Sequence, residues 1–600
     1  MMLRKENRVS EEKVSLKIDG KVYECVAGLS ILEACAKAAI DIPTLCYLKD
    51  INHEAACSIC LVEVKGAKTL LRACVTSVKE GMEVFTNTPR VRNARRLNLE
   101  LLLAGHPKDC LVCDRNQSCE LRKLAFDMGI REVRFPKTTK IELPLDNTSV
   151  SLSRDPNKCI LCGRCVAVCS AIQSVKAIDF SGRGKSSKVT TFFDQGLANS
   201  VCVNCGQCLL VCPTGAIIEK NATKEVWNAL SDPKKFVVVE VAPAVRASIG
   251  EEFGMPVGSL ATAKLAEGLR KLGFAKVFDT QFSADLTIME EGHELIQRIK
   301  NKGKLPMITS CSPGWIKFAE HFFPEILENI SSCKSPQQMF GAVAKTYYAR
   351  KYNLDPRNIV VVSIMPCTAK KFEAMRPEMK GAFNYWKNEL NLKENEVFYD
   401  VDYVLTTREA ARMIKETGIN FVNLAGEDFD EPLGISTGAA VIFGATGGVM
   451  EAALRTAYEV LTGRQLEKLD FMDLRGLSGI KIAEIDIDGL KLKVAVANSL
   501  SNARVLLEEV KQGSSPYAFI EIMTCPGGCL GGAGQPIPTN NEIRLKRMEA
   551  IYREDKNKPL RKSHENPAVQ ALYKEFLGEP LGELSHHLLH THYKKREGAL

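Results

Sequence analysis

Beyond about residue 234, mainly apolar runs alternate with longer amphipathic stretches. Residues 236–241 (FVVVEV) have the character of a buried strand, and an Ala-Pro-Ala loop follows them. The pattern then predicts a helix over 258–272, a strand over 276–279, a helix over 285–300 and a strand over 305–311. Strands that alternate with helices favour a mostly parallel sheet covered by helices. We therefore expect a large α/β domain here.

Three apolar runs of this region end at a cysteine. They are MITSC, NIVVVSIMPC and YAFIEIMTC, which end at Cys311, Cys367 and Cys525, and a glycine-rich turn with Cys529 follows the third. Ligands of open α/β sheets bind at the carboxyl ends of strands, so we expect these thiols to converge on one site. Four thiolates are the ligand set of a [4Fe–4S] cube. The alternative is a buried strand with two unused thiols.

The N-terminal region has a different pattern. Residues 13–24 alternate apolar and polar positions around Asp19-Gly20, which predicts a β-hairpin. Ser30 then caps a predicted helix over 30–39. Cys25 and Cys35 fall within the hairpin region and this helix, and we expect both to be core residues.

Four cysteines follow with the spacing C-x10-C-x2-C-x13-C, namely Cys46, Cys57, Cys60 and Cys74. Plant-type ferredoxins hold a [2Fe–2S] cluster with C-x4-C-x2-C and a distant fourth cysteine. The first gap is longer here, and a zinc site needs the same four thiolates. The preceding hairpin and helix favour the [2Fe–2S] interpretation.

A second group of ligands follows an Arg- and Leu-rich helix predicted over 89–105. It has the form H-x3-C-x2-C-x5-C and comprises His106, Cys110, Cys113 and Cys119. One imidazole and three thiolates bind either zinc or an iron–sulfur cube. The residue types alone leave both possibilities open.

After a charged, proline-containing linker at about 131–150, the chain contains an internal repeat. Its two C-x2-C-x2-C-x3-C runs comprise Cys159, Cys162, Cys165 and Cys169, then Cys202, Cys205, Cys208 and Cys212. In bacterial two-cluster ferredoxins, the fourth cysteine of each run ligates the other cluster. We therefore expect Cys212 to join the first three cysteines, and Cys169 to join the second three. Ser170 replaces the usual proline, and the insert at 171–200 is long.

Composition narrows the class of protein. A chain of 600 residues implies several domains, and its net charge of +8 is not concentrated in a basic run, which argues against nucleic acid as a partner. The N-terminus lacks an apolar signal core, and no apolar stretch is long enough to span a membrane. We expect a soluble cytoplasmic protein. In such a protein, 22 cysteines indicate metal sites rather than disulfides.

Three segments carry a family resemblance: TSCSPGW, MPCTAKKFE and EIMTCPGGCLGGAGQP. They resemble the signature segments of [FeFe]-hydrogenases, and the order of the upstream motifs resembles the long form of that family. The resemblance implies a [2Fe–2S] cluster, a His-ligated [4Fe–4S] cluster and two further [4Fe–4S] clusters. It also implies an H-cluster, which is a [4Fe–4S] cube joined to a two-iron unit with CO, cyanide and a dithiolate amine.

The implied fold is multidomain, α+β and α/β. It comprises a β-grasp [2Fe–2S] ferredoxin-like domain (12–88), a small His/Cys cluster domain (89–130), a two-[4Fe–4S] ferredoxin-like domain (150–222) and the large α/β H-cluster domain (234–600). Such a graded series of redox centres is typical of an enzyme that exchanges electrons with an external carrier.

The resemblance also implies roles at the H-cluster. Cys529 bridges the cube to the two-iron unit, Cys367 and Cys525 are cube ligands, and Lys370 donates to a cyanide. The pocket of the two-iron unit is expected to be lined by Pro243, Ala244, Gln337, Met365, Phe443 and Met523. Phe443 begins a Gly-rich segment that lacks the Gly-Lys-Ser/Thr ending of a phosphate loop.

A proton relay is also implied. Glu291 and Glu294 are three residues apart on a predicted helix and share a face, and with Ser331 they match the family's relay. The alternative is two exposed carboxylates on a solvated helix. Burial of a relay carboxyl would raise its pKa.

One position departs from the family. The first segment usually has two adjacent cysteines, a proton relay followed by a cube ligand, whereas this chain has Cys311-Ser312. Either a local shift makes Cys311 the ligand and Ser312 the relay, or the cube has a serine ligand. Because iron–sulfur clusters favour thiolate, the first hypothesis is preferred. Cys333 is an additional candidate ligand.

The resulting hypothesis is an [FeFe]-hydrogenase that acts on H2 and protons. Its electron partner is ferredoxin or flavin- and NAD(P)-binding sister subunits, since the chain has no GxGxxG fingerprint on a strand–turn–helix. The tail is similar to that of catalytic subunits of NAD(P)-linked hydrogenases, and its four histidines within 586–592 are expected to pack or face solvent. The alternatives are a non-enzymatic iron–sulfur scaffold or assembly protein, and a sensor.

Overall fold

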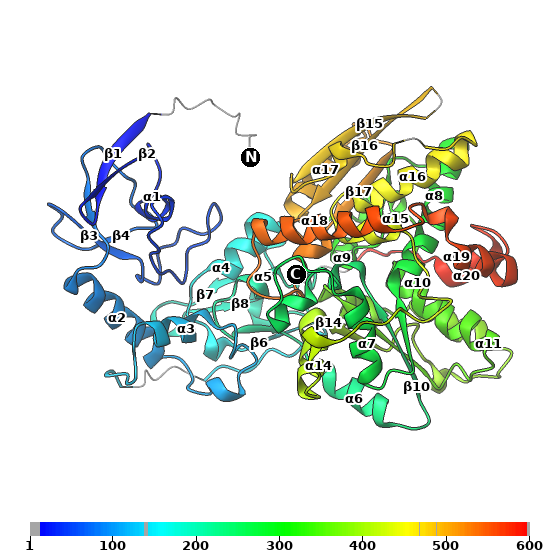
Figure 1. Ribbon diagram of the computed structural model, residues 1–600, viewed down its shortest axis with the longest axis horizontal. Helices are drawn as coiled ribbons and strands as arrows, with labels where there is room; N and C mark the ends of the chain where they lie inside the picture. The colour runs from blue at the N-terminus through cyan, green and yellow to red at the C-terminus, as the bar shows by residue number, and fades with distance from the viewer. Residues whose placement is uncertain (1–11, 137–141, 467, 488, 597–600) are drawn as a thin grey trace.

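The computed structural model describes residues 12–136, 142–466, 468–487 and 489–596. The molecule is elongated in Figure 1, with the N-terminal sheet at one end and the large α/β part at the other. The repeated cysteine motifs lie on the segments between them. The order of the domains along the chain is therefore also their order in space.

The N-terminal domain is a five-stranded sheet with the order β2-β1-β5-β3-β4. Its strands are β1 (Lys13–Ile18), β2 (Lys21–Val26), β3 (Leu61–Val64), β4 (Leu71–Arg72) and β5 (Glu83–Phe85). The β1–β2 hairpin is antiparallel, and β1 pairs with β5 in parallel. Ser30 and Glu33 form a reciprocal cap on α1 (Ile31–Lys37). Cys25 and Cys35 belong to the core of this domain, as predicted.

The middle of the chain is built from short elements. They are α2 (Pro89–Ala104), α3 (Glu120–Asp127), β6 (Leu152–Arg154), α4 (Arg164–Ala167), β7 (Asp179–Ser181), β8 (Lys188–Thr190), α5 (Gln207–Val211), β9 (Ile217–Glu219) and α6 (Thr223–Ser231). Strands β6 and β9 pair antiparallel, so the chain leaves the repeat beside the point where it enters. The β7–β8 hairpin lies in the long insert.

The large part contains two four-stranded sheets, where the sequence pattern predicted one. The first has the order β11-β10-β13-β14 and is entirely parallel. It consists of β10 (Phe236–Val241), β11 (Lys276–Asp279), β13 (Ile359–Met365) and β14 (Tyr403–Thr406).

The second sheet has the order β12-β17-β16-β15. It consists of β12 (Met307–Ile308), β15 (Ile480–Ile487), β16 (Leu490–Asn498) and β17 (Phe519–Met523). The prediction of a single sheet was wrong because β12 pairs with β17 and not with β10 or β11. The antiparallel β15–β16 hairpin completes this sheet.

Helices pack around both sheets. They are α7 (Thr262–Lys271), α8 (Thr280–Lys300), α9 (Pro313–Phe322), α10 (Pro336–Val343), α11 (Ala349–Lys351), α12 (Ala369–Ala374), α13 (Gly381–Trp386), α14 (Thr407–Glu416), α15 (Gly438–Val441), α16 (Gly448–Thr462), α17 (Leu500–Lys511), α18 (Asn541–Asn557), α19 (Pro567–Leu572) and α20 (Glu583–Leu589). Helix α8 begins earlier than predicted because Asp279 caps it, accepting a hydrogen bond from the Gln281 amide.

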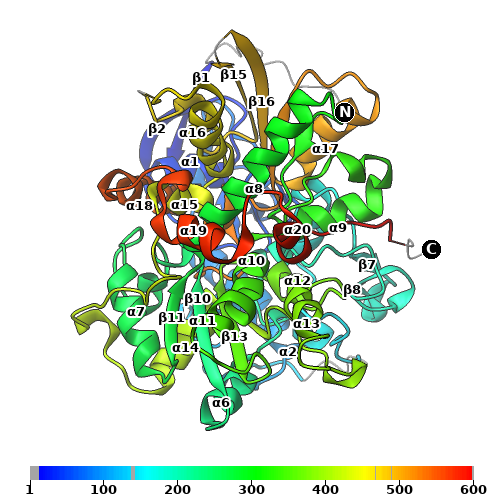
Figure 2. The ribbon, with the colours of Figure 1, turned by 90° about the vertical axis from the view of Figure 1, so that its right-hand side faces the viewer.

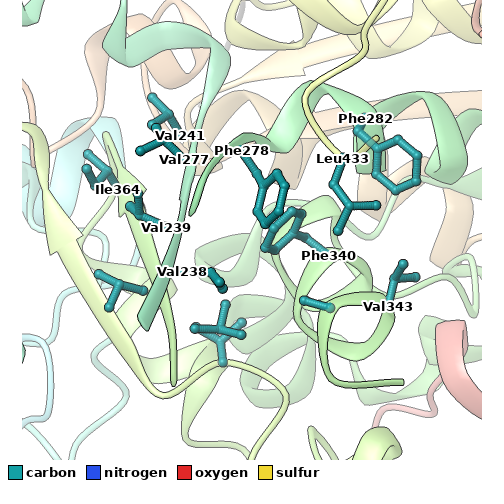
Figure 3. Close-up of a cluster of buried hydrophobic side chains, with 14 of the residues drawn as sticks. Val238, Val239, Val241, Val277, Phe278, Phe282, Phe340, Val343, Ile364 and Leu433 are labelled. Atoms are coloured by element: carbon teal, nitrogen blue, oxygen red, sulfur yellow. The ribbon is translucent and has the colours of Figure 1, made fainter. Parts of the chain in front are cut away.

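The core of the first sheet joins it to α8 and α10. Figure 3 shows valines of β10 together with Phe278 of β11, which meets Phe340 of α10, and Phe282 of α8 nearby. Every labelled side chain of this cluster is buried. Burial of each large apolar side chain contributes roughly 1.5–3 kcal/mol, so this core fixes α8 against the carboxyl ends of the strands.

Candidate metal centres

The three cysteine-bearing strand ends meet at one cavity of about 80 Å³. Cys311 follows β12, Cys367 follows β13, and Cys525 and Cys529 follow β17. These strands belong to both sheets, so the cavity lies where the carboxyl ends of the two sheets face each other. The predicted pocket residues also line it, namely Pro243, Ala244, Gln337, Met365, Lys370, Phe443 and Met523.

Glycine at 528 lets the third segment approach its neighbours. Gly528 has a φ of +83°, and a Cβ there would lie 2.6 Å from the Thr446 backbone nitrogen. Any side chain at this position would collide with the backbone of the Gly-rich segment that follows Phe443. That segment therefore packs against the turn that carries Cys529, as expected for close-packed backbone beside a cluster.

The cavity thiols fit an iron–sulfur cluster. Burial raises the pKa of Cys529 to about 12 and that of Cys525 well above the usual range, and neighbouring Cys367 raises both further. Thiolates packed together in a dry cavity repel one another, so bound cations are needed to stabilise them. All cysteines of the chain are free of disulfides, which keeps these thiols available.

Lys370 is held at the edge of the cavity by a buried carboxylate. Its Nζ donates to Glu373 at 2.8 Å and to the Cys311 carbonyl at 3.1 Å. Burial disfavours the ammonium, but Glu373 keeps the pKa of Lys370 above its usual value. Gln337 also donates to Glu373, at 3.2 Å. The cavity therefore has a fixed positive charge.

A line of proton-carrying groups leads from Cys311 towards the surface. Glu291 and Glu294 are 1% and 7% exposed, which excludes a solvated helix face. Burial and the nearby Glu294 raise the pKa of Glu291 to about 8, and Ser331 lies close enough to hydrogen-bond it. Ser331 donates to Glu294 at 2.7 Å. The structure thus brings the three predicted relay residues together.

Cys311 and Ser312 face different neighbours. Burial raises the pKa of the Cys311 thiol, and the charge of Glu291 raises it further, so the relay carboxyl acts electrostatically on this thiol. The Ser312 hydroxyl lies 2.7 Å from the Thr524 hydroxyl and accepts from the Thr524 amide at 3.2 Å. Ser312 is therefore next to the segment that carries Cys525, and both residues line the cavity.

Cys333 lies outside the cavity, next to Glu294 and His590. Its Sγ lies 3.8 Å from Glu294 and 4.0 Å from His590 Nδ1. It is not among the residues that line the cavity. The geometry therefore does not support Cys333 as an additional ligand of a cluster there.

The four N-terminal thiols also come together. Cys60 and Cys74 have their Sγ atoms 3.3 Å apart, and Cys46 hydrogen-bonds Cys57. The bond from Cys46 lowers the pKa of Cys57 to about 6, and that from Cys74 lowers the pKa of Cys60 to about 7. The same bonds raise the pKa values of Cys46 and Cys74, so each pair shares one proton and four thiols within bonding distance in pairs form a compact metal-binding set.

The His106 group adjoins the repeat. Cys119 lies 3.6 Å from the Pro213 carbonyl, directly after Cys212, and Arg115 donates to the Cys212 carbonyl at 2.9 Å. Burial raises the pKa of Cys119, and Cys113 raises it further. Cys110 is exposed. Cys119 also packs against a cluster that contains Cys46 and Cys57 of the N-terminal domain and Cys162 of the repeat, so this group lies between the two.

The repeated motifs form two pockets with crossed membership. Cys212 shares one with Cys159, Cys162 and Cys165, and Cys169 shares the other with Cys202, Cys205 and Cys208. Gly206, in the second run, has a φ of +67°, and a Cβ there would lie 2.5 Å from both Ala533 and Thr368. Gln207 donates to the Gly531 carbonyl at 3.0 Å. The second pocket is thus packed directly against the segments that form the cavity.

Crossed membership predicts which cluster each variant loses. We expect Cys169→Ala to lose the same cube as Cys202→Ala, so that the two proteins share one residual EPR spectrum. Cys212→Ala is expected to match Cys159→Ala instead. Iron analysis of the purified proteins checks that one cube is lost in each case. Pairing of the Cys169→Ala spectrum with that of Cys159→Ala would contradict the crossed arrangement.

The fold and these sites define an iron–sulfur oxidoreductase whose metal centres lead to a buried cavity. The family model for the iron only hydrogenase large subunit, C-terminal domain, matches residues 235–533, and the iron hydrogenase small subunit model matches 541–596. A 2Fe-2S iron-sulfur cluster binding domain matches 11–89, the NADH-ubiquinone oxidoreductase-G iron-sulfur binding region matches 95–134, and a 4Fe-4S dicluster domain matches 158–216.

Relatives that match nearly the whole chain are also hydrogenases. The chain is 50% identical to the NADP-reducing hydrogenase subunit HndD of Solidesulfovibrio fructosivorans, over 97% of this chain and 99% of that protein. It is 42% identical to iron hydrogenase 1 of Clostridium pasteurianum, over 96% and 99%. The structure of a variant of apo [FeFe]-hydrogenase HydA1 from Chlamydomonas reinhardtii matches with a TM-score of 0.55 and 42% identity, over 63% of this chain and 99% of that one.

The chain therefore belongs to the iron-only hydrogenase family, the oxidoreductases that act on H2. The predicted family, fold class and enzyme class are confirmed. Among the residues that the structure describes, no helix is both long and apolar enough to cross a bilayer.

Proposed function

We propose that the protein catalyses 2H⁺ + 2e⁻ ⇌ H2 at an H-cluster held in the cavity of Cys367, Cys525 and Cys529. The convergence of these thiols with Lys370, Met365 and Met523 on one buried cavity carries the proposal. When bound, the two-iron unit supplies the open iron position and the amine at which H2 forms or splits. The protein supplies ligands, fixed charge, a dry site and proton access.

We assign Cys367 and Cys525 as cube ligands and Cys529 as the bridge. Ser312 would be the remaining ligand of the cube, because it lines the cavity and its hydroxyl lies beside the Cys525 segment. Cys311 then carries the proton, because its thiol lines the cavity and the charge of Glu291 acts on it. The geometry thus favours the position-by-position assignment over the ligand role that was preferred for Cys311 from the sequence.

Lys370 and the relay residues act on charge and protons. Lys370, fixed by Glu373, offers a charge-assisted hydrogen bond to an anionic ligand in the cavity. Glu291, whose pKa is raised to about 8, holds a proton at neutral pH and can pass it to the Cys311 sulfur as that thiol gives its own proton into the cavity. Ser331 and Glu294 return a proton to Glu291 from the surface side.

Electrons reach the cavity through accessory clusters. We propose one [2Fe–2S] and three [4Fe–4S] clusters, in the units 12–88, 89–130 and 150–222, with the H-cluster in 234–600. The contact of Gln207 with Gly531 brings the last accessory site against the cavity segments. Burial raises the pKa of Cys525, and the charge of Cys205, in the last accessory site, raises it further, which supports direct transfer between the two centres.

The likeness to an NADP-reducing hydrogenase subunit favours flavin- and NAD(P)-binding sister subunits as the electron partner, with free ferredoxin as the alternative. The chain lacks a dinucleotide fingerprint of its own, so pyridine nucleotide chemistry requires such a partner. Co-purification from the native source, followed by NADP⁺ reduction with H2, distinguishes the two. Reduction by ferredoxin alone, with no bound subunits, would support the alternative.

Infrared spectroscopy tests the central proposal. We expect anaerobically purified, matured protein to show sharp CO and cyanide bands and to evolve H2 from reduced viologen. The bands report the two-iron unit independently of turnover. A protein with all iron–sulfur clusters and working maturation proteins, but with neither bands nor H2, would overturn the proposal and favour a scaffold or electron-transfer protein.

A further inference from the structure

The C-terminal segment returns a histidine to the interior of the molecule. His590 is 6% exposed and follows α20, which lies beside α10 in Figure 2. The Thr591 amide donates to the Ser332 carbonyl at 2.7 Å, and the Lys334 amide donates to the Leu589 carbonyl at 2.7 Å. This backbone pairing places His590 opposite Cys333, in the turn that also carries the relay residue Ser331.

A buried carboxylate sets the state of His590. Its Nε2 lies 3.1 Å from Glu290, which also accepts hydrogen bonds from Tyr573, Ser585 and the Leu581 amide. Burial opposes ionisation of Glu290, but the bonds from His590, Ser585 and Tyr573 hold its pKa below the usual value. The ring therefore donates from Nε2, and Nδ1 accepts from the Ser332 hydroxyl at 2.8 Å.

Cys333 joins this histidine to the relay. Its fully buried thiol lies 3.8 Å from the Glu294 carboxylate and 4.0 Å from His590 Nδ1. On its other side, Glu294 is paired with Arg298 at 2.6 Å. A guanidinium does not release its proton in proteins, so on this side a proton reaches the 10% exposed Glu294 side chain from solvent and not through Arg298. A thiol and an imidazole both donate and accept.

His586 connects His590 with solvent. The two rings are stacked with their centroids 4.3 Å apart. His586 is exposed and lines an open surface pocket together with His587, Glu579 and Glu583. A proton on His590 therefore has a titratable neighbour at the surface.

We propose that Cys333, His590 and His586 form a second branch of the proton path, from Glu294 to solvent through the C-terminal segment; the branch rests on the proposed hydrogenase function. During H2 formation, the Cys333 thiol gives its proton to the Glu294 carboxylate while imidazolium at His590 returns one to sulfur. His590 is then reprotonated from solvent by way of the exposed His586 imidazole, which takes up the next proton from water. The ionised Glu290 stabilises the imidazolium, and no electron moves in these steps.

The test uses the matured full chain with Cys333→Ala, Cys333→Ser and His586→Ala, and with His587→Ala as the matched control. The main readout is the ratio of HD to H2 formed from D2 in H2O, which does not depend on the fraction of loaded enzyme. Slower proton exchange at the site releases more HD per H2.

We expect Cys333→Ala and His586→Ala to raise this ratio at least about twofold and to lower H2 evolution roughly threefold to tenfold. Cys333→Ser is expected to restore both, because its hydroxyl also donates and accepts, and His587→Ala is expected to match wild type. Unchanged ratios in both Cys333→Ala and His586→Ala would overturn the branch. His586 is exposed, so its variant decides the question even if Cys333→Ala fails to fold. Wild-type protein without any exchange would overturn the proposed function itself.

Discussion

Replacing Glu291 with glutamine is expected to lower H2 evolution and H2 oxidation at least about 100-fold, in line with the loss of a positioned proton-transfer group. Glutamine preserves the size of the side chain and its bonding to Ser331, but it does not pass protons. The cavity itself is untouched, so the CO and cyanide bands and the cluster EPR signals should remain. Viologen-linked assays in both directions, with infrared spectra of the same samples, measure this.

The pH profile sharpens this prediction. Glu291 has its pKa raised to about 8, so it is protonated below that pH and ionised above it. Proton delivery for H2 evolution should therefore decline as the pH rises through about 8. His293→Gln is the matched control, because His293 lies on the same helix but bonds the Met289 carbonyl instead. A Glu291→Gln protein with full activity and an unchanged profile would contradict the relay.

Local spacing explains why the accessory sites could be predicted. Cysteines such as Cys159 and Cys162 are close in sequence, and the crossed arrangement follows from the repeat itself. The cavity residues were found through family signatures that join strand ends. Cys367 and Cys525 share the cavity because two separate sheets meet there. The hydrophobic periodicity of the sequence does not show how two sheets are arranged.

Long-range contacts explain what the sequence could not reveal. The site of His590 depends on pairing between backbone groups near residues 333 and 590, far apart in the chain. The tail histidines were expected to pack or face solvent, and His586 does face solvent. His590 differs because Glu290 and Ser332 bind both of its ring nitrogens. The only sequence signal was a histidine-rich tail, which does not identify a partner.

At Cys311 and Ser312, the residue types and the geometry favour different assignments of the ligand. Thiolate is the better ligand for iron, which favours Cys311 as the ligand. The charge of Glu291, however, acts on the Cys311 thiol, whereas the Ser312 hydroxyl lies 2.7 Å from that of Thr524. A ligand must reach the metal as well as suit it, so we give the geometry precedence.

We therefore expect Cys311→Ala to keep the EPR signal of the cube and to lose at least about 100-fold of turnover, as for Glu291→Gln. Ser312→Ala is expected to lower the iron content and to weaken the EPR signal of the cube, because it removes the hydroxyl that we assign as the remaining ligand. EPR spectra and iron analysis of protein that lacks the two-iron unit make this comparison without relying on activity.

Ser312→Cys separates a ligand role from a merely structural one. A thiolate there should keep the cube and raise its reduction potential, because the harder oxygen ligand stabilises the oxidised iron more than sulfur does. A cube potential that is the same in Ser312→Cys and wild type would mean that the serine oxygen does not touch iron. Loss of the cube signal in Cys311→Ala, together with its retention in Ser312→Ala, would assign the ligand to Cys311. The proton would then have to cross from Glu291 by way of Ser312, whose hydroxyl is already bonded to Thr524.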